Sequence, residues 1–393
     1  MEFAAFADRA ERLAAEPADI ETTRLVADLL AAGDRGGSDG DDLATVSRFL
    51  LGRVFPAHDT RTLDVGPARC REAIARAAGP NVTADDVEER LAEEGEIGAV
   101  AAGFEFGGQR GLAAFGEGRD RLTVAAVDAE LRELAAAAGD GSESRKRDIL
   151  FGLFNRCEPA EAKILARLVL GEMRLGVGEG AVRDAIAEAF LAETPAGDDG
   201  ETETDGDGDT EADGDGDDPT LHADDEAVEA VERALQVTND YGHVAVLARD
   251  EGLAGLRAEG LEVGRPVQAM LAQAGTATDA VEAFGEVAVE SKFDGARVQV
   301  HYVPASTVDG GDVGDETDDS DHETDDSDDD SGLGPRIYSR NMDDVTDALP
   351  EVVEYVEARV SVPVILDGEV VAVDDDGDPL PFQEVLRRFR RKH

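Results

Sequence analysis

The sequence predicts a multidomain protein in which an all-α amino-terminal domain is followed by an α+β domain. From Glu2 to about Ala192 the apolar residues recur at helical spacing, and strand patterns are missing. Beyond Gly264-Arg-Pro266 apolar and polar residues alternate with a period of two, which is typical of strands. We place the two domains at residues 1–258 and 259–393. A length of 393 residues, with 41% hydrophobic, suffices for two such cores.

Helix boundaries in the first domain are marked by local signals. Thr83 and Thr123 precede helical patterns and are predicted N-caps, and Pro159 is predicted to occupy a first helical turn. The helical pattern resumes at Asp224–Gln236. The acidic segment that precedes it therefore interrupts a helical domain and does not separate two domains.

Two acidic segments are predicted to be disordered inserts, at residues 196–222 and 305–332. Their central tracts, Asp198–Asp218 and Asp309–Asp330, hold 12 and 13 acidic residues and no Lys or Arg. Such tracts cannot bury enough apolar surface to offset the entropy lost on ordering.

The charge balance is strongly acidic, with 90 Asp and Glu against 37 Lys and Arg and a formal net charge of -53. This excludes a protein that binds nucleic acid or anionic membranes through overall positive charge. Only four of the bases are lysines. A carboxylate-rich, lysine-poor composition indicates a halophilic protein, because molar salt screens its self-repulsion within about 3 Å.

Cysteine use and hydropathy indicate a cytoplasmic, soluble chain. Cys70 and Cys157 are too few for a disulfide framework or a four-thiolate zinc site, and we expect both to be reduced core residues. The first 24 residues lack the basic region of a signal peptide, and no apolar run approaches the roughly 18 residues that span a bilayer.

The second domain is predicted to contain two hairpins. In the first, Val287–Ser291 and Val298–Tyr302 are joined by a turn at Asp294-Gly295; in the second, Val364–Leu366 and Glu369–Val373 are joined at Asp367-Gly368. A further strand at Ile337-Tyr338 leads into Ser339-Arg340-Asn341.

The candidate catalytic residue is Lys292, at the predicted end of a strand. A lysine amine is a nucleophile only when neutral, and neighbouring cations or burial favour the neutral form. Arg297 returns beside it on the hairpin, Arg340 ends a strand after the acidic insert, and Glu369 lies at the second hairpin turn. One amine, two guanidiniums and one carboxylate could grip a nucleotide and attack its phosphate. The alternative is a surface lysine, a surface arginine and a turn acid.

These motifs resemble those of a known family. Lys292-Phe-Asp-Gly-Ala-Arg297, then Ser339-Arg-Asn341, then Leu366-Asp-Gly-Glu369, following a helical domain, are similar to the ATP-dependent DNA ligases of the archaeal replicative type. Further similar stretches run through both domains: Phe49–Pro56, Leu168–Gly180, Gly264–Leu271 and Pro381–Arg388. Capping enzymes and RNA ligases share the lysine motif without the long helical domain. The sequence pattern of the amino-terminal domain is also unlike that of NAD-dependent ligases.

The resemblance implies a helical DNA-binding domain and a nucleotidyltransferase (ATP-grasp-like adenylation) domain that seal nicks in duplex DNA during replication, repair and recombination. It implies that Lys292 attacks ATP to form a lysyl-AMP, that Glu290 lies against the adenine, and that Arg297 and Arg340 contact the ribose and phosphates. It further implies that Glu369 contacts the ribose or a Mg²⁺ ion. The protein is expected to be a monomer.

The chain departs from the family at its end. It stops at His393, whereas the family continues with further adenylation motifs and an OB-fold domain. We therefore expect an incomplete adenylation domain and poor nick sealing by this polypeptide alone. The alternative function is a non-catalytic remnant of a ligase that binds nicked DNA.

Two further segments are candidate partner sites. Six bases, namely Arg145, Lys146, Arg147, Lys163, Arg167 and Arg174, precede the turn Gly176–Gly180, which is expected to open a helix and offer backbone N–H groups to a DNA phosphate. The stretch from Gln109 through Leu112 to Phe115 approximates a peptide that docks on the sliding clamp, although it has one aromatic residue where two are usual.

Overall fold

The computed structural model describes residues 1–34, 42–106, 121–139, 141–192, 221–268, 274–304 and 334–389. The predicted insert at 305–332 lies outside the described residues, as does that at 196–222 except for its last two residues, of which His222 bonds to the Glu188 carboxylate through its backbone N–H and its ring Nδ1. The chain divides into two compact units, Met1–Leu235 with Asp240–Glu259, and Gln236–Asn239 with Gly260–His393.

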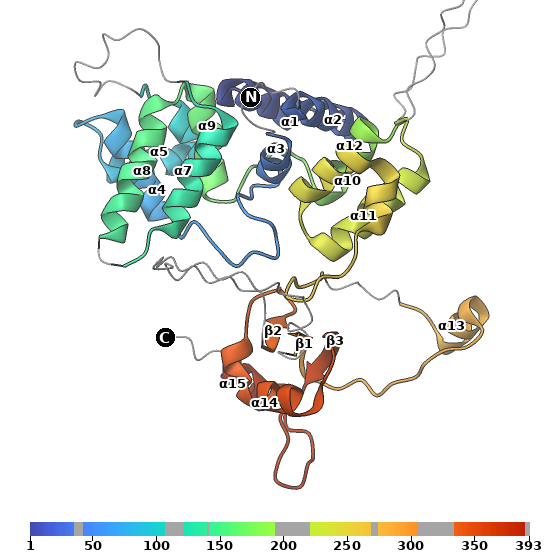
Figure 1. Cartoon of the computed structure of the whole chain (residues 1–393). Helices are drawn as coiled ribbons and strands as arrows, with labels where there is room; N and C mark the ends of the chain where they lie inside the picture. Colours follow the sequence, from blue (N-terminus) through green and yellow to red (C-terminus); the bar gives the residue numbers. More distant parts are fainter. Residues whose placement is uncertain are drawn as a thin grey trace, which may run out of the picture. The chain divides into compact units, whose positions relative to one another are not determined.

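The described part of the first unit consists of helices and the loops between them, with an isolated bridge between Glu2 and Thr123. Its helices are α1 (Phe3–Ala15), α2 (Asp19–Asp34), α3 (Leu43–Leu50), α4 (Pro67–Ala78), α5 (Ala84–Glu94), α6 (Ile97–Ala102), α7 (Val124–Ala136), α8 (Ser142–Arg156), α9 (Pro159–Val169), α10 (Glu179–Phe190), α11 (Asp225–Thr238) and α12 (Tyr241–Ala258). Within this unit α3 lies between the group around α7 and α8 and the group around α10 and α12 (Figure 1). None of the described helices is long and apolar enough to cross a membrane.

The helix starts in this unit follow the predicted caps. Thr83 and Asp86 form a capping box at the start of α5, and the Thr123 hydroxyl accepts the Ala126 backbone N–H at 3.1 Å. Pro159 occupies the first turn of α9. Cys70 and Cys157 are buried free thiols, and burial raises the pKa of Cys70 to about 12. These predictions are confirmed.

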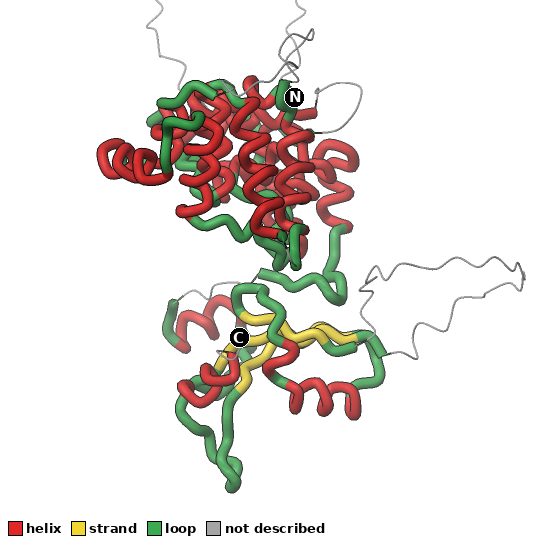
Figure 2. The backbone as a smooth tube through the Cα atoms, turned by 90° about the vertical axis from the view of Figure 1, so that its left-hand side faces the viewer, coloured by secondary structure: helices red, strands yellow, loops and turns green. Residues whose placement is uncertain are grey.

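The second unit is built on an antiparallel sheet with strand order β2-β1-β3. Its elements are α13 (Ala277–Phe284), β1 (Ala296–Tyr302), β2 (Arg336–Ser339), α14 (Pro350–Arg359), β3 (Val364–Val370) and α15 (Phe382–Phe389). One face of β1 carries Val298, Val300 and Tyr302, which pack against α14 and α15. Figure 2 shows the strands of this unit with helices beside them. The opposite face carries polar side chains, because successive residues of a strand point to opposite sides.

The predicted first hairpin is wrong. Val298–Tyr302 is strand, but Val287–Ser291 forms no strand, and Val289 is 90% exposed. The alternation of Val287 and Val289 with polar residues fits a half-buried strand. However, β1 is hydrogen-bonded by β2 on one edge and by β3 on the other, so neither edge can accept a hairpin partner.

The second predicted hairpin is also wrong, because β3 runs straight through Asp367-Gly368. Seven consecutive residues of β3 pair with Ala296–Tyr302, and Gly368 is the partner of Val298. The turn comes at the next Asp-Gly. Gly377 has φ +87°, and its N–H donates to the Asp374 carbonyl at 3.1 Å. An Asp-Gly pair permits a turn, but the pairing of neighbouring residues decides whether one forms.

Candidate functional site

Two of the predicted site residues face each other at one end of the sheet. Arg297 on β1 is the register partner of Glu369 on β3. The Glu369 carboxylate accepts the backbone N–H of Gly295 at 2.8 Å, just before β1 begins. A Cβ at Gly295 would lie 2.4 Å from the Val370 carbonyl oxygen, so the close approach of the two backbones requires glycine there. Glu369 therefore fixes the path by which the chain enters β1.

Arg340 lies at the same end of the sheet. Ser339, the last residue of β2, pairs with Val298 near the start of β1, and Arg340 begins the turn that follows. The Ser339 hydroxyl accepts the backbone N–H groups of Asn341 at 3.2 Å and Asp343 at 3.3 Å, which tightens the turn after β2. Arg340 itself is exposed.

Lys292 and Glu290 lie in an exposed segment that precedes β1 and belongs to no strand. Within the described ranges, neither side chain forms an ion pair or a hydrogen bond. Lys292 is connected to this end of the sheet only along the sequence, where it precedes Arg297 by five residues. The structure thus gathers Arg297, Glu369 and Arg340 at one sheet end and shows no contact of Lys292 or Glu290 with them.

Sequence reasoning missed Asp367. The Arg297 guanidinium donates from Nε to Asp367 Oδ1 at 3.0 Å and from Nη2 to Oδ2, and this bond raises the pKa of Arg297 above its ordinary value. If Asp367 were a turn residue, the sequence would not determine toward which face of the sheet its side chain points. As a strand residue it shares a face with Glu369, because the two are separated by the strand period.

The described residues hold no group of three or more His, Cys, Asp or Glu side chains that could bind a metal ion. Magnesium is commonly bound by one or two carboxylates together with phosphate oxygens and water. Glu369, of which one oxygen accepts the Gly295 N–H, fits as a single ligand of that kind.

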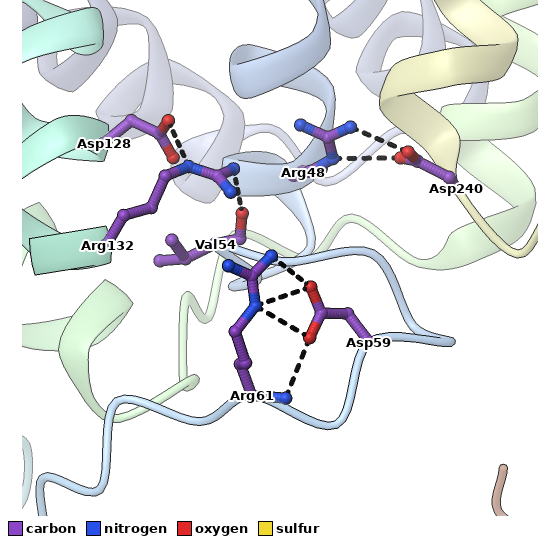
Figure 3. A network of polar contacts seen from close by, with 7 residues as sticks. All are labelled: Arg48, Val54, Asp59, Arg61, Asp128, Arg132 and Asp240. Atoms are coloured by element: carbon purple, nitrogen blue, oxygen red, sulfur yellow. Dashed lines mark hydrogen bonds and ion pairs between the residues drawn. The ribbon is translucent and has the colours of Figure 1, made fainter. Parts of the chain in front are cut away.

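The helical unit carries an open groove of about 580 Å³, walled by the loop after α3 and the end of α9. The loop is held by cations. Arg132 donates to the Val54 carbonyl at 2.9 Å, and Arg61 binds Asp59 (Figure 3). The guanidiniums of Arg61 and Arg132 lie 4.5 Å and 5.0 Å from the Phe55 ring centroid. The loop is therefore a fixed wall.

The helix ends at this groove repeat one geometry. Gly52 donates to Phe49 and Arg53 donates to Arg48 after α3, as Gly171 donates to Leu168 and Glu172 to Arg167 after α9. Gly52 has φ +70° and Gly171 has φ +69°, and a Cβ on Gly52 would lie 3.1 Å from the Gly171 carbonyl oxygen. The two turns therefore contact each other through Gly52 and Gly171.

A neighbouring groove of about 410 Å³ lies at the start of α10 and is lined by Leu50, Leu51, Arg53 and residues 173–179. Gly178 is the N-cap of α10, and Gly176 has φ +72°. The predicted turn before a helix is therefore present, although the helix begins at Glu179. Arg53 lines both grooves and binds Glu179 at 2.7 Å.

The six bases predicted to meet DNA do not form a free positive patch. Lys146 and Arg167 are buried, and they bind Asp64 at 2.9 Å and Glu96 at 3.0 Å. Arg145, Lys163 and Arg174 pair with Glu133, Glu11 and Glu172, and Arg147 donates to the Glu143 carbonyl. Five of the six thus bind carboxylates in this structure, and contact of these bases with a DNA phosphate stays a prediction.

Comparison with known proteins agrees with this architecture. Residues 2–187 match the family described as "DNA ligase N terminus", and residues 330–393 match the "ATP dependent DNA ligase domain". Arg340 and Glu369 lie inside the second match, and Lys292 lies between the two.

The relatives align along the whole chain. The DNA ligase of Halorubrum lacusprofundi is 82% identical over 393 residues, that of Haloferax volcanii 60% over 399, and that of Archaeoglobus fulgidus 39% over 394. In each case all of this chain is covered, together with 62%, 60% and 58% of the relative. The chain thus spans about three fifths of the length of these relatives.

The chain thus carries two domains in order, a helical one that matches the DNA ligase N terminus and a second that matches the ATP dependent DNA ligase domain. The chain belongs to the ATP-dependent DNA ligase family.

Proposed function

We propose that this chain supplies the DNA-gripping and nucleotide-binding parts of an ATP-dependent DNA ligase that seals nicks through a lysyl-AMP on Lys292. The observation that carries the proposal is the alignment of Arg297, Glu369 and Arg340 at one sheet end, with Lys292 immediately upstream on the chain. Relatives that match the chain along its whole length are named DNA ligase.

In the proposed first step the Lys292 amine, in its neutral form, attacks the α-phosphorus of ATP. A phosphorus–nitrogen bond forms, the bond to the pyrophosphate oxygen breaks, and the amine loses a proton. Arg297 and Arg340 would hold the ribose and phosphates, and Glu290 would contact the adenine. The AMP would then pass to the 5′-phosphate of a DNA nick, where the 3′-hydroxyl displaces it.

Glu369 would hold a Mg²⁺ ion as its one carboxylate ligand, together with polyphosphate oxygens and water. When bound, magnesium would neutralise charge on the polyphosphate. Glu369 would at the same time keep Gly295, and with it the chain after Lys292, in place through the hydrogen bond to the backbone N–H.

For DNA we propose the two grooves beside Arg53. The fixed loop after α3 and the N-terminus of α10 present backbone groups there, and backbone N–H groups at a helix N-terminus favour phosphate. This proposal does not depend on the six bases, five of which bind carboxylates in this structure.

A non-catalytic protein that binds nicked DNA is a second candidate. It is favoured by the position of Lys292, which lies outside the sheet and contacts none of the described residues that would serve it. In that case the helical unit would retain its DNA contacts while the first chemical step fails.

Covalent labelling separates the two candidates. The purified chain, in about 3 M KCl to match the screening of its charge, is incubated with magnesium and α-labelled ATP beside Lys292→Ala and a Lys163→Ala control. Label on the wild type and on Lys163→Ala, but not on Lys292→Ala, supports the ligase reaction. Absence of label, with nicked DNA still bound, supports the non-catalytic function.

The sliding-clamp peptide at Gln109, Leu112 and Phe115 lies outside the described residues. Clamp docking, the monomeric state and the cytoplasmic location stay predictions from the sequence.

A further inference from the structure

Side chains on the polar face of the sheet form hydrogen bonds to the backbone of Gly264–Val267. Gln299 accepts the Val267 N–H at 2.9 Å and donates to the Val267 carbonyl at 2.6 Å. His301 Nδ1 accepts the Gly264 N–H at 2.9 Å, and the Tyr338 hydroxyl donates to the Gly264 carbonyl at 2.6 Å. Both ends of Gly264–Val267 thus have their backbone donor and acceptor satisfied.

These contacts are buried and mutually supporting. Gln299 and Tyr338 are less than one tenth exposed and His301 is 1% exposed. The His301 and Tyr338 rings meet edge to face with centroids 5.0 Å apart. Pro266, between the two ends, has its carbonyl bonded by Asn239 at 2.9 Å. We name Gln299, His301 and Tyr338 the side-chain clamp.

The clamp gives the segment a direction. Gly264 lies against His301 and Val267 lies against Gln299, so the segment runs opposite to β1. Arg297 is two residues further along the same face of β1. The Val267 end of the segment is therefore the end nearer to the sheet end where Arg297, Glu369 and Arg340 gather.

The hydrogen-bond chemistry fixes the state of the clamp. Because His301 Nδ1 accepts a backbone N–H, the ring is neutral and its proton is on Nε2. That buried Nε2 has no partner among the described residues. A neutral histidine and an amide pair carry no charge, so molar salt does not screen the clamp as it screens ion pairs.

We propose that the side-chain clamp positions Gly264–Val267 as a wall of the nucleotide site beside Arg297, which makes Gln299, His301 and Tyr338 positioning residues for ATP. This inference rests on the proposed function. Loosening the clamp is expected to weaken ATP binding by letting the wall move, while the lysine chemistry itself is left unchanged.

The test uses the whole chain with Tyr338→Phe, which removes one hydroxyl and keeps the ring, and Gln299→Met, which removes both bonds to Val267. Tyr355→Phe is the matched control, because Tyr355 lies on α14 and is 65% exposed. Adenylate labelling against ATP concentration gives the half-saturating concentration and the maximal rate. Hydrogen exchange of the Gly264 and Val267 amides reports the wall directly.

We expect the half-saturating ATP concentration to rise at least about fivefold in each clamp variant, which corresponds to about one lost hydrogen bond. The maximal rate should stay within about twofold, and exchange should quicken at the two amides. Faster exchange with an unchanged ATP requirement would reduce the clamp to a purely structural role. If the wild type takes no label, the lysyl-AMP proposal fails separately, and calorimetric titration of ATP into the same variants decides the clamp.

Discussion

The guanidinium of Arg297 is held by Asp367 on the neighbouring strand, two residues away from its own register partner Glu369. Both carboxylates are on the face of β3 that Arg297 shares. One anchors the backbone before β1, and the other orients the cation that would meet the nucleotide. The orientation of the Arg297 guanidinium therefore depends on Asp367, and the path of the backbone into β1 depends on Glu369.

Replacing Asp367 with Asn should damage nucleotide use more than folding. The pair with Arg297 is about half exposed, and such pairs contribute roughly 0–1 kcal/mol to stability. We expect an unfolding free energy within about 1 kcal/mol of wild type, but labelling by ATP reduced about tenfold or more as Arg297 loses its fixed orientation. Denaturant titration and labelling measure the two effects. Equal loss in Asp376→Asn, in the distant turn after β3, would argue against a specific role.

Arg167→Met should destabilise the helical unit strongly. Arg167 binds the carboxylate of Glu96, and both side chains are largely buried. Its removal would leave the Glu96 carboxylate with only the backbone N–H groups of Gly98 and Ala99, and breaking a buried ion pair costs about 3–5 kcal/mol. Arg145→Met, which breaks the exposed pair with Glu133, should cost less than about 1 kcal/mol. Thermal or denaturant unfolding in high salt checks both; equal costs would contradict the assignment of Arg167 to a buried pair.

Acid should weaken the second unit before its carboxylates titrate. Burial lowers the pKa of His301 from its ordinary 6.5 to about 4. Between these values the unfolded chain binds a proton that the folded chain does not, so the free energy of unfolding falls as the pH falls. The loss is up to roughly 3 kcal/mol by pH 4. His301→Asn keeps an acceptor for Gly264 without titrating, and its melting temperature should fall less over this range. Parallel pH profiles would contradict the prediction.

Gly52→Ala should disturb the joint between the two turns. A left-handed backbone costs a non-glycine residue roughly 1–2 kcal/mol, and here the added methyl also approaches the Gly171 carbonyl. Gly95→Ala is the control, because Gly95 has φ +73° with open space around it. We expect Gly52→Ala to be the less stable of the two in denaturant titration, and to bind nicked DNA more weakly. Equal stability of both variants would show that the contact carries no cost.

The helical unit was predictable because its signals are local. The caps at Thr83 and Thr123 and the proline at α9 depend on residues within one turn, and the structure confirms them. The second unit was harder. Whether Val287–Ser291 is a strand depends on the free edges of β1, which distant segments occupy.

The site residues show the same division. The motif around Lys292 could be recognised from adjacent residues, and Arg297, Glu369 and Arg340 do share one sheet end. Asp367 could not be assigned, because the Asp-Gly pair that follows Leu366 favours a turn and β3 overrides it. The ion pairs of Lys146 and Arg167 could not be predicted, since their partners, Asp64 and Glu96, are far away in sequence.

The contact of Gly52 with Gly171 couples two stretches of chain that are distant in sequence. The two stretches should therefore be exchanged between relatives only as a pair. A chimaera that takes residues 42–66 from one relative and residues 159–180 from another would have to match the two turns, because a Cβ on Gly52 would lie 3.1 Å from the Gly171 carbonyl oxygen. Exchanging both stretches together should preserve the grooves. Exchanging one stretch alone should disturb the packing of the two turns that wall the groove where DNA is proposed to bind.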